Sequence, residues 1–276
     1  MHQAKKRAAG QHGVGSGERK LPRRMAIESP AAATAGSFDA RDWPGRRTRE
    51  PGIRDYGWLP LRSLAAQMRE TLARHFAGRA DLQVLDLGCD HKPYFPLFQP
   101  YARRYVGLDV GKTTKEVDVV GGASAPPFRA GQFDAVLCSQ VLEHVPDPLS
   151  TLKEIARVLK PGGRVLLSTH GTFIYHPHPT DFWRWTQEGL RKVFEDSDCF
   201  DEIELHANGG TGHCLAYLFA TYVYLGMKKK WQRPLRKLVI PFVNVGGLLL
   251  GRMLRKFDHP APHSLIANFL VVARRR

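Results

Sequence analysis

The feature that most constrains the fold is an apolar run that ends in a small-residue turn, Val84-Leu85-Asp86-Leu87-Gly88-Cys89-Asp90. A second apolar run, residues 105–109, closes on Asp109, which lies 23 positions after Asp86. Such a turn lets the backbone approach a ligand at the carboxyl end of a strand, and an acid about 20 residues later can bond a ribose hydroxyl. The layout therefore predicts an adenosine-containing cofactor. No glycine follows Gly88 before Gly107, so a dinucleotide, which prefers a three-glycine turn, is the weaker prediction.

Strand-like and helix-like patterns alternate along the middle of the chain. Strands are expected at residues 84–87, 105–109, 117–120, 133–138, 164–169, 202–206 and 266–273. Helices are expected at residues 61–75, 148–159 and 187–194. Pro148 suits the first turn of the second helix, and Thr186 can cap the third. Alternation of this kind predicts a mostly parallel sheet with helices on both faces.

Several sequence blocks resemble one family in their order and spacing. They are Asp86-Leu87-Gly88-Cys89, Lys92-Pro93-Tyr94, residues 133–145 and Leu159-Lys160-Pro161-Gly162-Gly163. With them the chain resembles the class I S-adenosylmethionine-dependent methyltransferases, most closely their type 11 group. The resemblance implies a Rossmann-like α/β fold of seven strands, the last one antiparallel, and S-adenosyl-L-methionine as cofactor. Residues 181–186 also resemble a segment of family members associated with surface-polysaccharide or glycolipid pathways.

The resemblance also assigns the cofactor site to three loops that follow strands. Ligands of such sheets bind beyond the carboxyl ends of the strands, where the strand order reverses. We expect Asp109 to bind the ribose hydroxyls, and Asp86 and Gly88 to hold the methionyl portion. The full set of expected cofactor-binding residues is Asp86, Gly88, Cys89, Asp90, Asp109, Val110, Ser139, Gln140 and His144.

Two positions depart from the family pattern. Asp90 stands where the family commonly has a glycine, and Gly122 stands where an acid commonly bonds the adenine amino group. A carboxylate close to the methionyl part needs a partner or water. These departures leave a second hypothesis open, namely a non-catalytic member of the family that binds a partner or a membrane surface.

The segment after the expected strand 164–169 concentrates titratable and aromatic groups, and we expect it to face the methyl acceptor. Its candidate catalytic residues are His176, His178 and Asp181, any of which can serve as a base for an acceptor hydroxyl. His170 and these three residues could also bind a metal ion, but nothing in their spacing fixes the geometry of such a site. No metal is therefore predicted. Arg184, between two tryptophans, suits an anionic group or a structural stack.

Net charge is distributed unevenly along the 276 residues. Residues 1–54 carry +7, residues 55–226 carry −3 and residues 227–276 carry +11. Because a nucleic-acid enzyme would have its basic surface around the cleft, this distribution argues against a nucleic-acid partner. Residues 1–54 are predicted to be a basic, disordered extension without the apolar run of a secretory signal, and residues 55–276 to be the methyltransferase domain.

Residues 207–264 form an expected helical insertion before the last strand. Two apolar runs, Leu215–Met227 and Leu238–Leu250, are separated by a basic segment, and each has 13 residues. A membrane-spanning helix needs about 20, so neither run is expected to cross a bilayer alone. Two alternatives remain open: a helical lid packed on the sheet, and a cap in peripheral contact with an anionic membrane.

The four cysteines, Cys89, Cys138, Cys199 and Cys214, have neither disulfide nor zinc-site spacing. This favours a reduced, cytoplasmic protein, and the insertion leaves open a peripheral position at the inner face of the membrane. The sequence thus predicts an S-adenosylmethionine-dependent enzyme that methylates an oxygen of a small molecule, sugar or lipid-linked glycan. It identifies neither the acceptor nor the oligomeric state.

Overall fold

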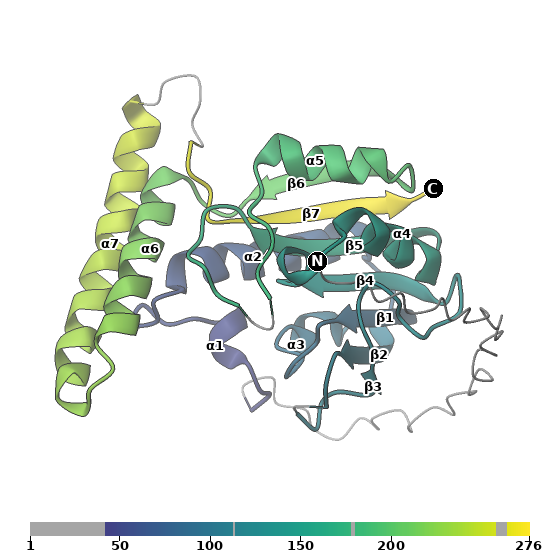
Figure 1. Ribbon diagram of the computed structural model, residues 1–276, viewed down its shortest axis with the longest axis horizontal. Coiled ribbons are helices and arrows are strands. Elements are labelled where there is room, and N and C mark those ends of the chain that lie inside the picture. Colours follow the sequence, from purple (N-terminus) through teal and green to yellow (C-terminus); the bar gives the residue numbers. More distant parts are fainter. Residues whose placement is uncertain (1–41, 113, 178–179, 258–263) are drawn as a thin grey trace, which may run out of the picture. The chain divides into compact units, whose positions relative to one another are not determined.

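A computed structural model describes residues 42–112, 114–177, 180–257 and 264–276 of the chain (Figure 1). One sheet contains the strands β1 (Leu82–Leu87), β2 (Ala102–Asp109), β3 (Val119–Val120), β4 (Phe133–Ser139), β5 (Leu159–His170), β6 (Phe200–Ala207) and β7 (Asn268–Arg275). Their order in the sheet is β3-β2-β1-β4-β5-β7-β6. The predicted fold, a seven-stranded Rossmann-like sheet, is confirmed.

Strand directions place the ligand-binding edge. β1 pairs in parallel with β2 and β4, and β4 pairs in parallel with β5. The chain moves outward from β1 to β3 and then returns to β4 on the other side of β1. The carboxyl ends of β1 and β4 therefore flank the point where strand order reverses, which is where open α/β sheets bind ligands. β7 runs antiparallel between β5 and β6, as the resemblance implied.

Helices cover both faces of the sheet because its central strands are apolar on both sides. On β4, Val136 and Cys138 face one apolar cluster, and Ala135 and Leu137 face the other. The first cluster includes buried residues of α4 (Pro148–Val158) and α5 (Gln187–Asp196). The second includes residues of α2 (Trp58–His75) and α3 (Phe95–Phe98). As expected, Thr186 caps α5 by accepting the Gly189 N–H at 3.0 Å.

Residues 42–54, which we expected to belong to the disordered extension, are partly folded onto the domain. They contain α1 (Arg46–Arg49), and Arg49 is only 1% exposed. Its guanidinium donates to the carbonyls of Trp43, Pro44 and Pro93 at 2.8–3.1 Å. A basic residue counted as part of a solvated tail therefore anchors the segment to the loop after β1. The rest of the expected extension, residues 1–41, lies outside the described residues.

The insertion between β6 and β7 is a helical hairpin made of α6 (Thr211–Gly226), the short helix η2 (Lys230–Gln232) and α7 (Arg233–Phe257). In Figure 1, α6 and α7 stand side by side beyond one end of the strands. Their backbones meet at small residues, since a Cβ on Gly212 would lie 2.5 Å from the Gly251 nitrogen. Below we call α6, η2 and α7 the α6–α7 hairpin.

The length of α7 differs from the expectation. The apolar run of 13 residues lies within a helix of 25, because the helix continues through Pro241 and through basic residues at both ends. Among the described residues, the segment Lys230–Lys256 is long and apolar enough for a membrane span: a window of 18 residues within it has a mean hydropathy of 1.4, and 22% of that window is buried. Length and composition alone therefore do not exclude a span for α7.

Candidate functional site

The loop after β1 is held against neighbouring strand ends by its backbone. The N–H groups of Gly88 and Cys89 both donate to the Leu108 carbonyl, at 2.8 and 3.1 Å. Gly88 has a φ of +68°, and a Cβ there would lie 2.3 Å from the Val141 side chain. The turn thus needs glycine for its conformation and for the close approach of the loop after β4.

Asp109 joins the loops after β1 and β2. Its carboxylate accepts the N–H of Asp90 at 2.9 Å and that of Val110 at 2.7 Å. Asp109 remains half-exposed, and a carboxylate has more acceptor sites than these two bonds use. The Val110 side chain beside it is 67% exposed. An oriented carboxylate next to an exposed apolar side chain fits a ribose with its adjoining base.

The two departures from the family pattern place no buried, bulky side chain where the cofactor is expected. Asp90 has a φ of 41°, which aspartate tolerates, and its side chain is 63% exposed, 3.6 Å from the His91 imidazole. Its carboxylate is therefore solvated. At Gly122, a Cβ would have no described atom within 4 Å. An acid is missing there, but no other side chain fills the space.

Asp86 is turned inward, away from a direct ligand role for its carboxyl. It is buried and accepts the Tyr105 hydroxyl at 2.7 Å, and burial raises the pKa of Asp86 to about 7. Beneath the same loop, Lys92 pairs with Asp118 at 2.6 Å, and Asp118 also accepts the Gly107 N–H. These contacts fix the shape of the turn, so the part of Asp86 that can face a ligand is its backbone.

Ser139 and Gln140 hold the loop after β4 against β5. Ser139 Oγ lies 2.9 Å from Ser168 Oγ, and the Gln140 N–H donates to the Ser168 carbonyl at 2.8 Å. Gln140 has a φ of 57°, and its Oε1 is buried without a hydrogen-bond partner among the described residues. Because this oxygen has almost no solvent-accessible surface, a ligand donor such as the ammonium of a methionyl moiety would reach it only after the Gln140 side chain turns.

The cysteines are packing residues. All four are free, and Cys89, Cys138 and Cys214 are buried. Burial raises the pKa of the Cys89 and Cys138 thiols well above their ordinary value, which disfavours the reactive thiolate. Cys89 therefore contributes to the cofactor loop through its backbone and its volume.

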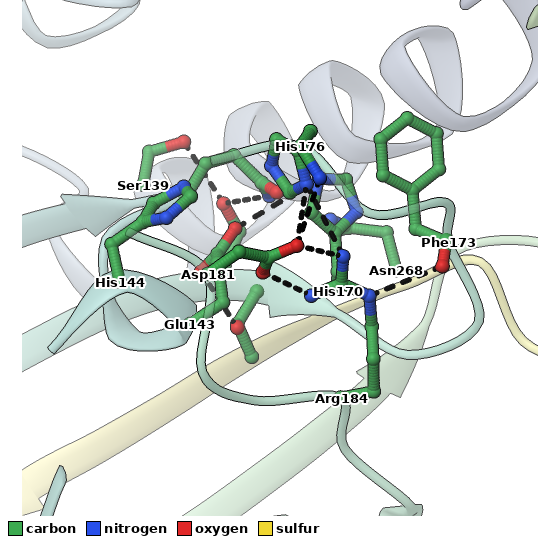
Figure 2. Close-up of polar contacts among 12 residues, drawn as sticks. Ser139, Glu143, His144, His170, Phe173, His176, Asp181, Arg184 and Asn268 are labelled. Atoms are coloured by element: carbon green, nitrogen blue, oxygen red, sulfur yellow. Dashed lines mark hydrogen bonds and ion pairs between the residues drawn. The ribbon is translucent and has the colours of Figure 1, made fainter. Parts of the chain in front are cut away.

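On the acceptor side, Arg184 organises the loop after β5 (Figure 2). Its guanidinium contacts both oxygens of Asp181, at 2.5 and 2.6 Å, and donates to the carbonyls of Phe173 and Ile174. Asp181 is 2% exposed in its side chain and also accepts the His176 N–H at 2.9 Å. The Arg184 hydrogen bonds lower the pKa of Asp181, so this carboxylate is a poor proton acceptor. Of the two roles expected for Arg184, binding an anionic group or holding the local structure, the structure shows the second.

His176 is the predicted base that the structure leaves best suited to the role. Its Nδ1 lies 3.5 Å from Asp181 Oδ2 and 3.2 Å from an Arg184 nitrogen. Burial lowers the pKa of His176, so the ring is neutral at pH 7 and able to accept a proton. His144, whose Nδ1 lies 2.5 Å from the Thr180 carbonyl, faces His176 edge to face. His178 lies outside the described residues.

Glu143 and His170 form a buried pair behind these histidines (Figure 2). Glu143 Oε2 accepts the Thr169 hydroxyl at 2.9 Å, and Oε1 lies 3.8 Å from His170 Nε2. Burial raises the pKa of Glu143 to about 7 and lowers that of His170 to about 3. Both groups therefore tend toward their neutral forms. His170 also stacks on Phe173 at 4.3 Å.

No metal ion was predicted. The residues that could hold one in the structure differ from His170, His176, His178 and Asp181, the set considered from the sequence. One ligand atom each from Glu143, His144 and His176 lie within 4.8 Å of one another. Glu143 Oε1 has no hydrogen-bond partner among the described residues. The donor set can accept a divalent cation, but each residue also has a position explained by packing or hydrogen bonds.

The structure brings most of the expected site residues to one edge of the sheet. The loops after β1, β2 and β4 meet through Gly88, Val141 and Asp109, and the loop after β4 reaches the acceptor side through His144. Sequence reasoning assigned no role to Glu143 or Tyr105. Glu143 lies within one of the family blocks, directly before His144, and that position could have indicated a role in the site. Nothing in the sequence distinguishes Tyr105 from an ordinary strand residue.

The chain matches the model of a known family. A family model described as "Methyltransferase domain" matches residues 61–200, which is half of the chain. The matched segment includes β1, β2, β4 and β5 with the loops described above, and it ends before the α6–α7 hairpin.

The chain is also similar to curated proteins and to solved structures. It is 35% identical over 107 residues to a ubiquinone biosynthesis O-methyltransferase of Pseudomonas aeruginosa, covering 34% of this chain and 46% of that protein. It is 31% identical over 124 residues to the protein of that name from Erwinia tasmaniensis, covering 40% and 51%. The chain thus spans about half the length of these relatives. The solved structure of the [4+2]-cyclase SpnF has a TM-score of 0.50 at 18% identity, covering 76% of this chain and 80% of that chain, and shows the fold alone.

Proposed function

The chain belongs to the class I S-adenosylmethionine-dependent methyltransferases, and from this premise we propose that it methylates an oxygen atom of a small-molecule acceptor. One observation carries the proposal. The loop of residues 139–144 contacts the cofactor loops at one end and the histidine-rich acceptor side at the other. A methyl donor held by the first group of loops would therefore lie beside groups that can accept a proton.

The residues present fit S-adenosylmethionine. Asp109 offers an oriented carboxylate for ribose hydroxyls, and Val110 offers an apolar surface for the base. Gln140 Oε1 is an unpaired acceptor that a turn of its side chain would present to the methionyl ammonium. When bound, this cofactor supplies an electrophilic methyl group on a sulfonium that becomes neutral on transfer. The contribution of the chain is to hold the donor and the acceptor oxygen in line and to manage one proton.

We assign that proton to His176, with Asp181 and Arg184 as positioning residues. Asp181 Oδ2, at 3.5 Å, can accept a proton carried on His176 Nδ1, whereas the Arg184 nitrogen at 3.2 Å can only donate to Nδ1. Of the two tautomers, the one with its proton on Nδ1 leaves Nε2 to accept a proton from an acceptor hydroxyl, and we propose it for the reactive state. Arg184 fixes Asp181 and the backbone of the same loop, so the imidazole is held without freedom to turn. His144 is the neighbouring group that would contact cofactor or acceptor.

For the acceptor class, we favour a sugar or lipid-linked glycan hydroxyl. Tyr175 and Phe182, on either side of the Asp181 turn, are 74% and 49% exposed. Exposed aromatic rings beside a few fixed polar groups are typical of sites for small ring-shaped ligands. The names of the curated relatives support oxygen as the methylated atom, whereas the glycan is our extension. We place the reaction in the cytoplasm, at its membrane face if the acceptor is lipid-linked.

The cofactor half of the proposal is tested by isothermal titration with S-adenosylhomocysteine. We expect saturable binding by the full chain and loss of it in Asp109→Ala. A well-folded wild-type protein that does not bind would instead favour the non-catalytic family member, because a scaffold need not hold the cofactor.

The acceptor half is tested with methyl-labelled S-adenosylmethionine and fractionated cell extract. We expect label in a small-molecule or lipid fraction that survives mild alkali, as a methyl ether does and a methyl ester does not. His176→Gln should abolish labelling while S-adenosylhomocysteine still binds. Label recovered only on nitrogen, or full labelling by His176→Gln, would contradict the assignment.

A further inference from the structure

The outer face of α7 exposes a continuous row of large apolar side chains. Residues spaced by three and four positions share one face of a helix, and this row has that spacing. It comprises Leu235, Leu238, Phe242, Val245, Leu249 and Met253, all between 40% and 70% exposed. We call it the α7 stripe. Monomeric proteins rarely expose contiguous apolar patches of this kind unless the patch meets another surface.

The stripe faces away from the rest of the protein. The opposite side of α7 is buried through Ile240, Asn244, Gly247 and Gly251, which recur at the same spacing. A Cβ on Gly247 would lie 2.4 Å from the Ala216 side chain of α6, so the two helices are already in close contact on that side. The α7 stripe is therefore not needed to pack the hairpin on the protein, because α7 makes those contacts with its opposite face.

Charge surrounds the stripe with one sign only. Residues 208–257 contain nine Lys and Arg and no Asp or Glu. Six of these cations lie between residues 228 and 237, and three lie between residues 252 and 256. Between these groups, α7 is uncharged from Leu238 to Gly251. An apolar strip with cations at both ends complements a lipid surface that has anionic headgroups around an apolar interior.

A cavity of about 410 Å³ lies where α6 ends and α7 begins. It is lined by Tyr224, Lys228, Arg233, Arg236 and Lys237, which we call the basic pocket. The Arg236 guanidinium stacks on the Tyr224 ring at 4.5 Å and donates to the Met227 carbonyl at 3.2 Å. One cation is thus held in place while three others surround the same space. Such a pocket fits a phosphate group.

The geometry favours lying on a membrane over crossing it. The 14 uncharged residues of α7 extend about 21 Å, whereas a bilayer interior is about 30 Å thick. A spanning hairpin would also carry six cations through that interior, each at a large cost in free energy. With the helix parallel to the surface, the cations stay among the headgroups.

We propose that the α6–α7 hairpin docks flat on an anionic lipid bilayer, with the α7 stripe in the interface and the basic pocket on a lipid phosphate. The inner side of the hairpin reaches the acceptor loop, because Tyr217 of α6 stacks on Phe173 at 5.0 Å and Phe173 stacks on His170. Docking would hold the acceptor side of the candidate site near lipid. The inference goes beyond the proposed methyl transfer, and either can fail without the other.

Sedimentation of the full chain with vesicles tests the docking. We expect binding to vesicles of phosphatidylcholine with phosphatidylglycerol and much weaker binding to phosphatidylcholine alone. Raising NaCl from about 0.05 M to about 0.5 M should release the protein by shortening the range of the electrostatic attraction. Equal binding to both vesicles, or none at low salt, would overturn the proposal.

Matched variants test its geometry. Arg233→Gln/Lys237→Gln should weaken binding by up to about fivefold for each charge removed. Arg103→Gln/Lys153→Gln removes the same charge from exposed residues outside the hairpin and should leave binding unchanged. Leu238→Gln/Phe242→Gln changes exposed residues only and should abolish sedimentation. Equal losses in the two charge variants, or none in the apolar one, would contradict a specific docking face.

Three outcomes would assign the surface to another occupant. Resistance of the vesicle-bound protein to an alkaline carbonate wash would indicate a span instead of peripheral docking. Displacement by inorganic phosphate at constant ionic strength would assign the basic pocket to a free anion. A dimer that Leu238→Gln/Phe242→Gln dissolves, without vesicle binding, would assign the α7 stripe to a second copy of the chain. In each variant, S-adenosylhomocysteine affinity serves as the readout for an intact methyltransferase core.

Discussion

The cofactor loops and the acceptor loop meet at one edge of the sheet, yet they are held in different ways. The loops after β1 and β2 are fixed by backbone N–H groups that converge on Leu108 and Asp109, close to the strands themselves. The loop after β5 is fixed by one side chain, Arg184, which collects a buried carboxylate and two carbonyls. The first arrangement follows from a short sequence motif. The second requires the described parts of the loop, residues 173–177 and 180–184, to be held by a single cation.

This difference suits two loop regions with different tasks: one holds a cofactor common to the family, and the other faces an acceptor that differs between members. Every class I member must hold the same donor, so backbone geometry and one carboxylate suffice, and the matched family segment includes those loops. The acceptor changes from one member to the next, and here the side that we propose for it contains histidines whose pKa values are lowered by burial and, to a lesser extent, by neighbouring charged groups. Four experiments test how far the contrast holds.

The largest expected effect is on the acceptor side. Arg184→Met removes the guanidinium from the Asp181 carboxylate, whose side chain is 2% exposed, and leaving a charged acceptor this enclosed without its donors should cost about 3 kcal/mol or more. Urea unfolding measures the change. As a control, Arg74→Met removes an exposed arginine that pairs with Glu70 and Glu204, and should cost less than about 1 kcal/mol. Similar losses in both variants would show that the acceptor loop does not depend on Arg184.

The next effect is on the cofactor side. Asp109→Ala should weaken S-adenosylhomocysteine binding by about 1.5–3 kcal/mol, the usual contribution of a charged hydrogen bond, while the domain stays folded. Asp90→Asn is the control, because its carboxylate is solvated and its backbone conformation suits asparagine. Titration calorimetry and circular dichroism provide the readouts. Unchanged affinity in folded Asp109→Ala would remove the ribose assignment.

A pH-dependent effect, smaller over any one pH unit, unites the two regions, since each contains one buried carboxyl. Burial raises the pKa of Asp86 and of Glu143 to about 7, above their values in an unfolded chain. The folded state therefore binds more protons between about pH 4 and pH 7, and stability falls as pH rises through that window, by at most about 1.4 kcal/mol per pH unit and group.

Thermal unfolding across this window measures the effect. Asp86→Asn and Glu143→Gln should each gain stability relative to the wild type as pH rises from about 4 to about 7, because neither variant has a carboxyl to ionise. Glu188→Gln, at an exposed position of α5, should run parallel to the wild type. A difference that shrinks with pH would mean that the buried carboxyls are charged and paired.

The smallest expected effect tests whether the cofactor side has been rebuilt. Gly122→Asp restores the family's usual acid where no described atom lies within 4 Å of the new Cβ. S-adenosylhomocysteine affinity should stay the same or rise by up to about 1 kcal/mol, one hydrogen bond. Gly122→Ala separates the effect of volume from that of the carboxylate. A marked loss in the aspartate variant alone would show that the adenine edge is bound differently here.

The sequence was sufficient for the fold where periodicity and local contacts agree. β1, β2 and β4 lie within three residues of their expected bounds because their apolar runs are buried on both faces. β3 is shorter than expected, since only Val119 and Val120 pair with β2, while Asp118 turns to Lys92. β5 begins at Leu159 instead of Arg164, because Leu159 already pairs with Phe133. Contacts between distant segments decided both differences.

The candidate site divides in the same way. Asp109 was predicted from its spacing alone, and the structure puts its carboxylate at the expected strand end. Asp86 was expected at the ligand, but Tyr105 on the neighbouring strand draws its carboxyl inward. The fixed position of Asp181 depends on Arg184, and the burial of Glu143 depends on strands formed elsewhere in the chain. No local pattern reports such burial.

The register of the last two strands has a consequence for how this protein could diversify. Ala207, the last residue of β6, is already the partner of Phe269 in β7, so the hairpin leaves and re-enters the sheet at one point. Long insertions at such a point add little to the entropy of closing the connection. The hairpin could therefore be exchanged without rebuilding the sheet. If the proposed docking holds, grafting a different hairpin between the same two strands would direct the same core to another cellular surface.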